Sequence, residues 1–141
     1  MRLRLLFTPA VLCSGLLMLG QFPAQAAAWD PQAFVKEDTV QIRTVGPEEG
    51  EYWFPVWLVV IDNQVYVRLG TRAAGRVTKN KAAPYLAVKI AGQEFDRVKG
   101  EETPEMAKAV ADAMASKYWS DIFVRFLSHP LTLRLMPEEK K

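Results

Sequence analysis

The stretch YWFPVWLVVIDNQVYVRL, residues 52–69, decides the fold class. Residues 52–61 are almost continuously apolar, and residues 64–69 continue the pattern beyond the pair Asp62-Asn63. Aspartate and asparagine tolerate the positive φ angles that a two-residue hairpin turn requires. The sequence therefore predicts an antiparallel β-hairpin near the middle of the chain.

Further short strands are expected on both sides of this hairpin. In each of them apolar or β-branched residues alternate with polar ones, as in half-buried strands. These candidate strands are residues 39–45, 86–91, 94–98 and 131–135. The turn residues and charges of 46–51 separate the first strand from the central hairpin. Gly92-Gln93 is the expected turn of a second hairpin.

A short helix is expected near the start of the domain. Asp30 is a suitable N-cap, and Pro31 suits the first helical position. We therefore expect a helix over residues 31–36, with Phe34 and Val35 facing the core.

A longer helix is expected over residues 104–118. Thr103 can cap it, and its apolar positions recur every four residues. These positions are Met106, Val110, Met114 and Tyr118. About six short strands with one late helix place the chain in the mainly β (α+β) class, as a small antiparallel barrel or a curled sheet.

Residues 1–26 have the composition of a secretory signal peptide. The segment begins with two arginines, continues with the apolar run 5–19, and ends in small residues at alternate positions. The apolar run is shorter than the roughly 20 residues that span a bilayer. We expect export to the periplasm or the extracellular space, with cleavage after Ala26 or Ala28. Retention as an uncleaved anchor is the alternative.

Cleavage would leave residues 27–141 as a single domain of 115 residues (141 minus 26). The chain has 18 basic and 16 acidic residues, and removal of Arg2 and Arg4 leaves 16 of each. A neutral domain argues against nucleic-acid binding. The single cysteine also leaves, and His129 is the single histidine, so neither a zinc site nor a Ser-His-Asp triad has support. We assign no metal site and no catalytic residue.

The clearest candidate site is a basic segment within residues 63–93, which contain no Asp or Glu. Its cations are Arg68, Arg72, Arg76, Lys79, Lys81 and Lys89. Residues 71–76 are expected to form a loop after a strand, where arginine forks and glycine amides can bind phosphate or carboxylate. The alternative is a solvated face whose cations pair with the acidic residues of 48–51 or 94–105.

Aromatic residues supply a candidate apolar wall beside this segment. Trp57 and Tyr66 lie in the central hairpin, and Phe123 follows the long helix; such residues are most often core. Trp53 and Trp119 have polar neighbours, as expected at the rim of a site. Together with the basic segment, these rings predict an apolar pocket next to a loop that binds anions.

Three stretches together resemble known families: VQIRTV (40–45), PVWLVVIDNQVYVR (55–68) and ASKY (115–118). They are similar to small families related to the pyridoxamine-phosphate oxidase-like split barrel and the deazaflavin-dependent nitroreductases. In those relatives a strand ending in Tyr-x-Arg precedes a basic loop, a Gly-centred hairpin and a helix with Lys-Tyr near its end. The match spans roughly residues 39–120. It implies a split β-barrel, commonly a homodimer, with flavin or deazaflavin at the subunit interface.

The resemblance makes Arg68, Arg72 and Arg76 candidates for a cofactor phosphate, and Trp57 or Tyr66 candidates for positions near the ring. The favoured function is an exported domain that binds an anionic small ligand, such as FMN or deazaflavin, through the basic loop from Arg68 to Lys81. One alternative is a flavin- or deazaflavin-dependent oxidoreductase, in which the cofactor supplies the chemistry. A further alternative is a non-catalytic protein-interaction domain.

Overall fold

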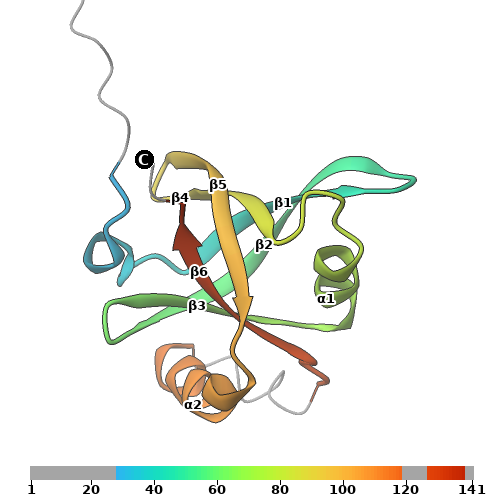
Figure 1. Ribbon diagram of the computed structural model, residues 1–141. Coiled ribbons are helices and arrows are strands. Elements are labelled where there is room, and N and C mark those ends of the chain that lie inside the picture. Colours follow the sequence, from blue (N-terminus) through green and yellow to red (C-terminus); the bar gives the residue numbers. More distant parts are fainter. Residues whose placement is uncertain (1–27, 119–126, 139–141) are drawn as a thin grey trace, which may run out of the picture.

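The computed structural model describes residues 28–118 and 127–138. These residues form six strands that close into an antiparallel barrel in the order β1-β2-β3-β6-β5-β4 (Figure 1). The strands are β1 (Thr39–Gly46), β2 (Gly50–Ile61), β3 (Gln64–Leu69), β4 (Tyr85–Ile90), β5 (Gln93–Glu102) and β6 (Leu131–Pro137). The mainly β class with one helix in the C-terminal half is therefore confirmed. The predictions for residues 1–26, Trp119 and Phe123 lie outside the described residues.

Two tight hairpins connect consecutive strands, as the sequence predicts. Asp62 and Asn63 form the turn between β2 and β3, with φ of 49° and 60°. The second turn lies one residue earlier than expected: Ala91 and Gly92 have φ of 51° and 73°. Gln93 is therefore the first residue of β5, and glycine takes the second position of the turn, where positive φ costs it least.

The barrel interior is filled by apolar residues that alternate along the strands. Members of this cluster are Val40, Ile42, Phe54, Leu58, Val65, Val67, Leu86, Val88, Val98, Leu133 and Leu135, each at most 7% exposed. Alternation brings every second side chain of a strand to the same face. The apolar residues whose alternation predicted the strands are therefore the ones that form the core.

An aromatic cluster packs against this core from the N-terminal segment. The ring of Phe34 lies edge-to-face against Trp29 and Phe95, with centroids 5.2 and 6.2 Å apart. Phe34 is the last residue of η1 (Pro31–Phe34), a single 3-10 turn. Val35 was predicted to face the core, but it is 46% exposed because the helix ends before it.

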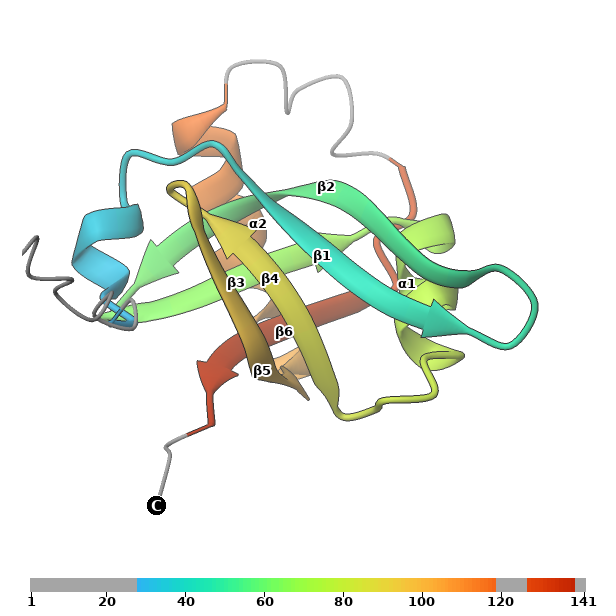
Figure 2. The same ribbon diagram turned by 90° about the horizontal axis from the view of Figure 1, so that it is seen from above.

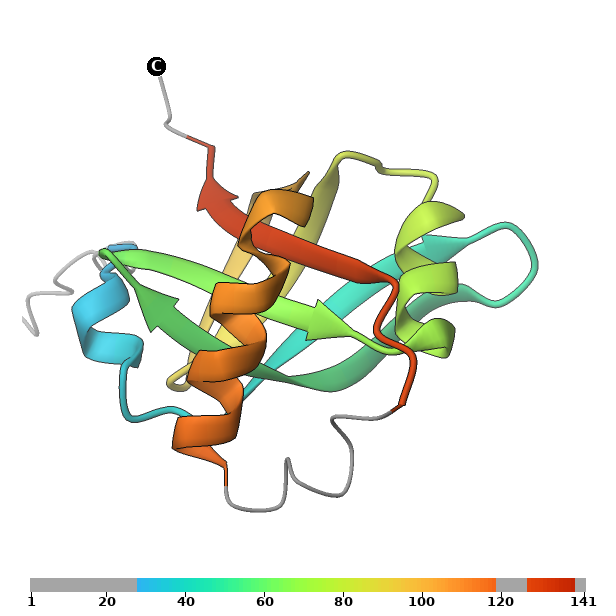
Figure 3. The same ribbon diagram turned by 90° about the horizontal axis from the view of Figure 1, so that it is seen from below.

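The helix α2 (Ala107–Lys117) covers part of the outside of the barrel, and the 3-10 turn η2 (Pro104–Met106) precedes it. Figure 3 shows α2 crossing β2 and β3. Its buried residues Val110 and Met114 pack against Val59 and Tyr66 on the outer face of those strands. Residues 104–106 were predicted as the first turn of the same helix and form this 3-10 turn instead. Among the described residues, no helix has the length and apolar character needed to span a membrane.

Residues 71–76, predicted as a loop, belong to the helix α1 (Thr71–Thr78). Figure 2 shows α1 at one side of the barrel, near the turn between β1 and β2. Ala74 is buried and Val77 packs against the core, and the Thr78 hydroxyl donates to the Ala74 carbonyl at 2.9 Å. This packing outweighs the helix penalty of Gly75, which is about 1 kcal/mol relative to alanine.

The barrel is split between β2 and β3. These strands pair only from Leu58↔Val67 to Ile61↔Gln64. Residues 50–57 of β2 pair with β1 alone, while the end of β3 pairs with β6. The two strands therefore diverge on the N-terminal side of Leu58, and the candidate site lies in the gap between them.

Candidate functional site

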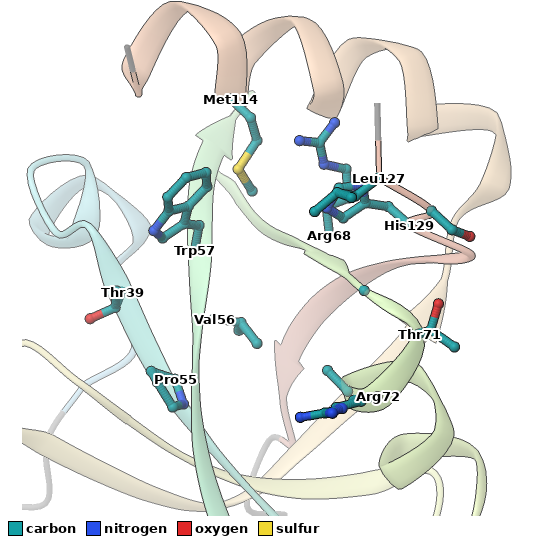
Figure 4. A pocket seen from close by; sticks show the side chains of 13 residues that line it. Thr39, Pro55, Val56, Trp57, Arg68, Thr71, Arg72, Met114, Leu127 and His129 are labelled. Atoms are coloured by element: carbon teal, nitrogen blue, oxygen red, sulfur yellow. The ribbon is translucent and has the colours of Figure 1, made fainter. Parts of the chain in front are cut away.

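A cavity of about 660 Å³, the split pocket, occupies the gap between β2 and the β3–α1 connection. Figure 4 shows these segments diverging on two sides of it, with α2 across one end. Its lining residues are Thr39, Pro55, Val56 and Trp57 on one side, Arg68, Gly70, Thr71, Arg72 and Ala73 on the other, and Met114, Leu127, Ser128 and His129 at the end. The volume lies within the range of about 300–1,000 Å³ that is usual for small-ligand sites.

The apolar wall of the split pocket is centred on Trp57. Its indole ring is stacked on the ring of Tyr118, with centroids 4.6 Å apart and planes 11° apart. The Tyr118 hydroxyl lies 2.7 Å from the carbonyl oxygens of both Asp38 and Leu58, and it donates to one of them at a time. The Trp57 ring is therefore held in place by a residue that is itself fixed to the barrel.

Lys117 strengthens this attachment. Its ammonium group donates to the Glu37 carbonyl and lies 3.3 Å from the Leu58 carbonyl. Burial lowers the pKa of Lys117, although the nearby charges of Asp38 and Glu37 act in the opposite direction. Burial also raises the pKa of Tyr118 to about 12, so its hydroxyl stays protonated and able to donate at neutral pH. The end of α2 is thereby tied to the start of β1 and to β2.

The charged side chains that line the split pocket are basic. Arg68 is half-buried and Arg72 is exposed, and no Asp or Glu is among the lining residues that the structure describes. Figure 4 shows Arg72 extending from α1 toward the β2 side of the cavity. Within the described residues Arg72 makes no ion pair. A pocket with this lining attracts an anion beside an apolar surface.

Three of the predicted site residues meet in the split pocket: Trp57, Arg68 and Arg72. Arg76 and Lys79 line a second cavity instead, on another part of α1. Glu49, one of the acidic partners that the alternative interpretation named, forms an ion pair with Arg76 at 3.3 Å. The basic segment is therefore divided between two places, and part of it is paired.

Tyr66 does not line the split pocket. It is 5% exposed and lies under α2, where it packs with Met114 and Val110. In contrast, His129, for which the sequence predicted no role, lines the pocket. The pairing of Leu131 in β6 with Leu69 in β3 brings the segment just before β6, and with it His129, to the pocket, and this pairing leaves no signal in the local sequence.

Comparison with known proteins supports the fold. No family model matches the chain, and no curated protein matches it. One similar solved structure is described as HutZ, the heme storage protein from Vibrio cholerae. It has a TM-score of 0.57 and 20% sequence identity, and the match covers 77% of this chain and 88% of that chain. Another, described as a domain-swapped dimer, has a TM-score of 0.53 and 13% identity over 71% of this chain and 80% of that chain. Both likenesses fit a split barrel.

Proposed function

We propose that this protein is a split-barrel domain that binds a small, flat, anionic ligand in the split pocket. The observation that carries the proposal is the lining of a 660 Å³ cavity, over the part of the chain that the structure describes, by an apolar wall and by the basic side chains Arg68 and Arg72. A planar ring would lie against Trp57, and an anionic group would meet Arg72 and Arg68. Arginine forks bind phosphate and carboxylate with two parallel hydrogen bonds.

A flavin-like ligand, FMN or deazaflavin, fits this description. The resemblance to the pyridoxamine-phosphate oxidase-like and deazaflavin-dependent families supports this class, because their strand ending in Tyr-x-Arg recurs at Arg68 and is followed by basic residues, here in α1. If a flavin binds, the ring would supply redox chemistry, and the protein would become an oxidoreductase whose residues hold and orient the ring. Trp57 and Arg72 would be binding residues in that reaction.

Heme is the second candidate, and the position of His129 favours it. Imidazole nitrogen is a common axial ligand of heme iron, and the two propionates of heme suit a pair of arginines. HutZ, one of the similar structures, is described as a heme storage protein. In this arrangement His129 would hold the iron while Arg68 and Arg72 hold the propionates.

The pocket mouth also supports a proposed homodimer. Leu127, at the end of the cavity, is 63% exposed, and Pro55 on the β2 side is exposed as well. A second copy that covered these residues would remove apolar surface from water and enclose the ligand.

If no ligand binds, the same surface favours the alternative of a non-catalytic interaction domain. Export of the domain through residues 1–26 stays part of the proposal, so the folded protein would take up its ligand after export.

Titration of the purified protein with FMN and with heme tests the proposal. Arg72→Ala should weaken binding of the anionic ligand about tenfold or more, because a charge-assisted hydrogen bond contributes about 1.5–3 kcal/mol. Lys108→Ala, which removes the same charge from a site 88% exposed on α2, is the matched control and should bind as the wild type does.

A further variant separates the two ligand classes. His129→Ala should abolish heme binding with its strong Soret absorption while leaving FMN affinity within about twofold. If neither FMN nor heme binds the wild type, or if Arg72→Ala and Lys108→Ala bind equally well, the proposal is wrong.

A further inference from the structure

A second cavity, of about 680 Å³, lies between α1 and the turn that joins β1 to β2. We call it the hairpin cavity. Its α1 side consists of Thr71, Arg72, Gly75, Arg76 and Lys79, of which the last four recur every three or four residues and therefore share one face of the helix. Glu48, Glu49 and Tyr52 line the opposite side. Thr71 and Arg72 line both cavities, so the two are neighbours along the start of α1.

Arg76 is held in a fixed position at the edge of this cavity. Its guanidinium carbon lies 4.2 Å from the centroid of the Tyr52 ring and 5.9 Å from that of Phe54. Its Nε lies 3.3 Å from a carboxylate oxygen of Glu49, but within the described residues this buried Nε–H has no well-directed hydrogen-bond acceptor. A guanidinium fixed by rings and a carboxylate loses little freedom when it binds an anion.

Gly75 leaves open the helix surface between the cations. A Cβ at this position would meet no atom within 4 Å, so close packing does not require glycine there. Gly75 does not have a positive φ angle either, so its backbone conformation is open to alanine. A glycine inside a helix destabilises it relative to alanine. Neither packing nor conformation explains this residue, whereas a ligand that approaches the α1 backbone would.

The charges favour an anion on the α1 side of the cavity. The cavity is lined by three cations and two carboxylates: Glu49 is paired with Arg76 and Glu48 lies on the opposite side, whereas Arg72 and Lys79, on either side of Gly75, make no ion pair within the described residues. The two cations lie about two helical turns apart, roughly 10 Å along the helix axis, with Arg76 between them, so all three line the same cavity from one helix. We propose that the hairpin cavity binds a phosphate-type anion at Gly75, Arg76 and Lys79, beside Arg72, the cation that this cavity shares with the split pocket.

Calorimetric titration of the full chain with inorganic phosphate, against a chloride background, tests this site. Gly75→Ala should raise the Tm by a few degrees because it favours the helix, yet weaken phosphate binding about tenfold because a methyl group enters the site. Lys79→Ala should weaken phosphate binding about fivefold. Lys108→Ala should leave it unchanged.

Arg68→Ala distinguishes the two cavities, because Arg68 lines the split pocket alone. The phosphate affinity of this variant should equal that of the wild type, whether or not its affinity for FMN or heme changes. A loss of phosphate affinity in Arg68→Ala would place the anion in the split pocket and overturn the inference. Wild-type phosphate affinity in a stabilised Gly75→Ala, or no saturable phosphate binding to the wild type, would also overturn it. Since these readouts use phosphate alone, failure of the proposed FMN or heme binding leaves them intact.

Discussion

The hydroxyl of Tyr118 offers a direct test of how the wall of the split pocket is held. It lies 2.7 Å from the carbonyl oxygens of Asp38 and Leu58, while the ring beneath it is stacked on Trp57. Tyr118→Phe removes the hydroxyl and keeps the ring. The substitution should therefore lower stability without moving the indole that faces the pocket.

The expected loss at neutral pH follows from the partners of the hydroxyl. Each carbonyl keeps a second donor: the Leu58 amide lies 3.4 Å from the Asp38 carbonyl, and Lys117 Nζ lies 3.3 Å from the Leu58 carbonyl. No buried acceptor is left without a donor, so the cost is that of one net hydrogen bond, about 1–1.5 kcal/mol. For a domain of this size such a loss lowers the Tm by roughly 3–8 °C.

The pH dependence gives a second signature. Burial raises the pKa of Tyr118 to about 12 in the folded protein, above its ordinary value of 10. A raised pKa means that the folded state favours the protonated hydroxyl. Its contribution is therefore fully present below pH 10 and is lost as the pH rises through about 12. Two pKa units correspond to about 2–3 kcal/mol. This loss exceeds the 1–1.5 kcal/mol advantage at neutral pH, so the wild type should lose stability more steeply than Tyr118→Phe and the two curves should cross between pH 10 and 12.

Urea unfolding from pH 7 to 12 measures both effects, and titration with FMN or heme measures the pocket. Tyr118→Phe should bind the ligand as the wild type does. Tyr118→Ala, which also removes the ring stacked on Trp57, should bind several-fold more weakly. Equal stability of the wild type and Tyr118→Phe at pH 7, or parallel stability curves up to pH 12, would refute this account of the contact.

Three further substitutions test other parts of the barrel. Asn80, 6% exposed, accepts two backbone N–H groups and donates to a backbone carbonyl, so Asn80→Ala should lower the free energy of unfolding in urea by about 2–4 kcal/mol; a loss below 1 kcal/mol would be unexpected. Ala91→Gly should raise stability by about 0.5–1 kcal/mol, because Ala91 has a φ of 51°; thermal melts showing no gain would contradict this. The hydrogen bond from Arg134 lowers the pKa of Glu101, so NMR titration of Arg134→Met should show that pKa rising toward 4.5; an unchanged value would argue against the pair. Because the pair stabilises the fold above the ordinary pKa of Glu101 and this contribution is lost as the pH falls through the lowered pKa, the variant should be less sensitive to acid.

The central hairpin could be predicted because its signal is local. Asp62 and Asn63 carry the turn, and the residues on both sides alternate or run as a strand requires. The closure of the barrel could not be predicted in this way, because β6 pairs with β3 and β5 across long sequence separations. That closure places His129 in the split pocket, so the position of this histidine could not be predicted from the sequence around it.

The candidate site was predicted only in part, because tertiary contacts decide which of its residues reach the pocket. Alternation assigns Trp57 and Tyr66 to the outer face of the sheet, but it does not tell which of them α2 covers. The helix buries Tyr66 and ends beside Trp57, so only Trp57 reaches the pocket. In α1, Gly75 indicated a loop, whereas the burial of Ala74 against the barrel, a tertiary contact, stabilises a helix.

The central claim is that the split pocket holds a flat anionic ligand through Arg72. The most direct test is the absorption spectrum, from 300 to 500 nm, of the protein purified from the compartment that the proposed export would reach, with mass spectrometry of whatever denaturation releases. The account predicts one absorbing, anionic ligand per chain in the wild type and its loss in Arg72→Ala. A folded, colourless wild type that releases no ligand and takes up neither FMN nor heme would contradict it.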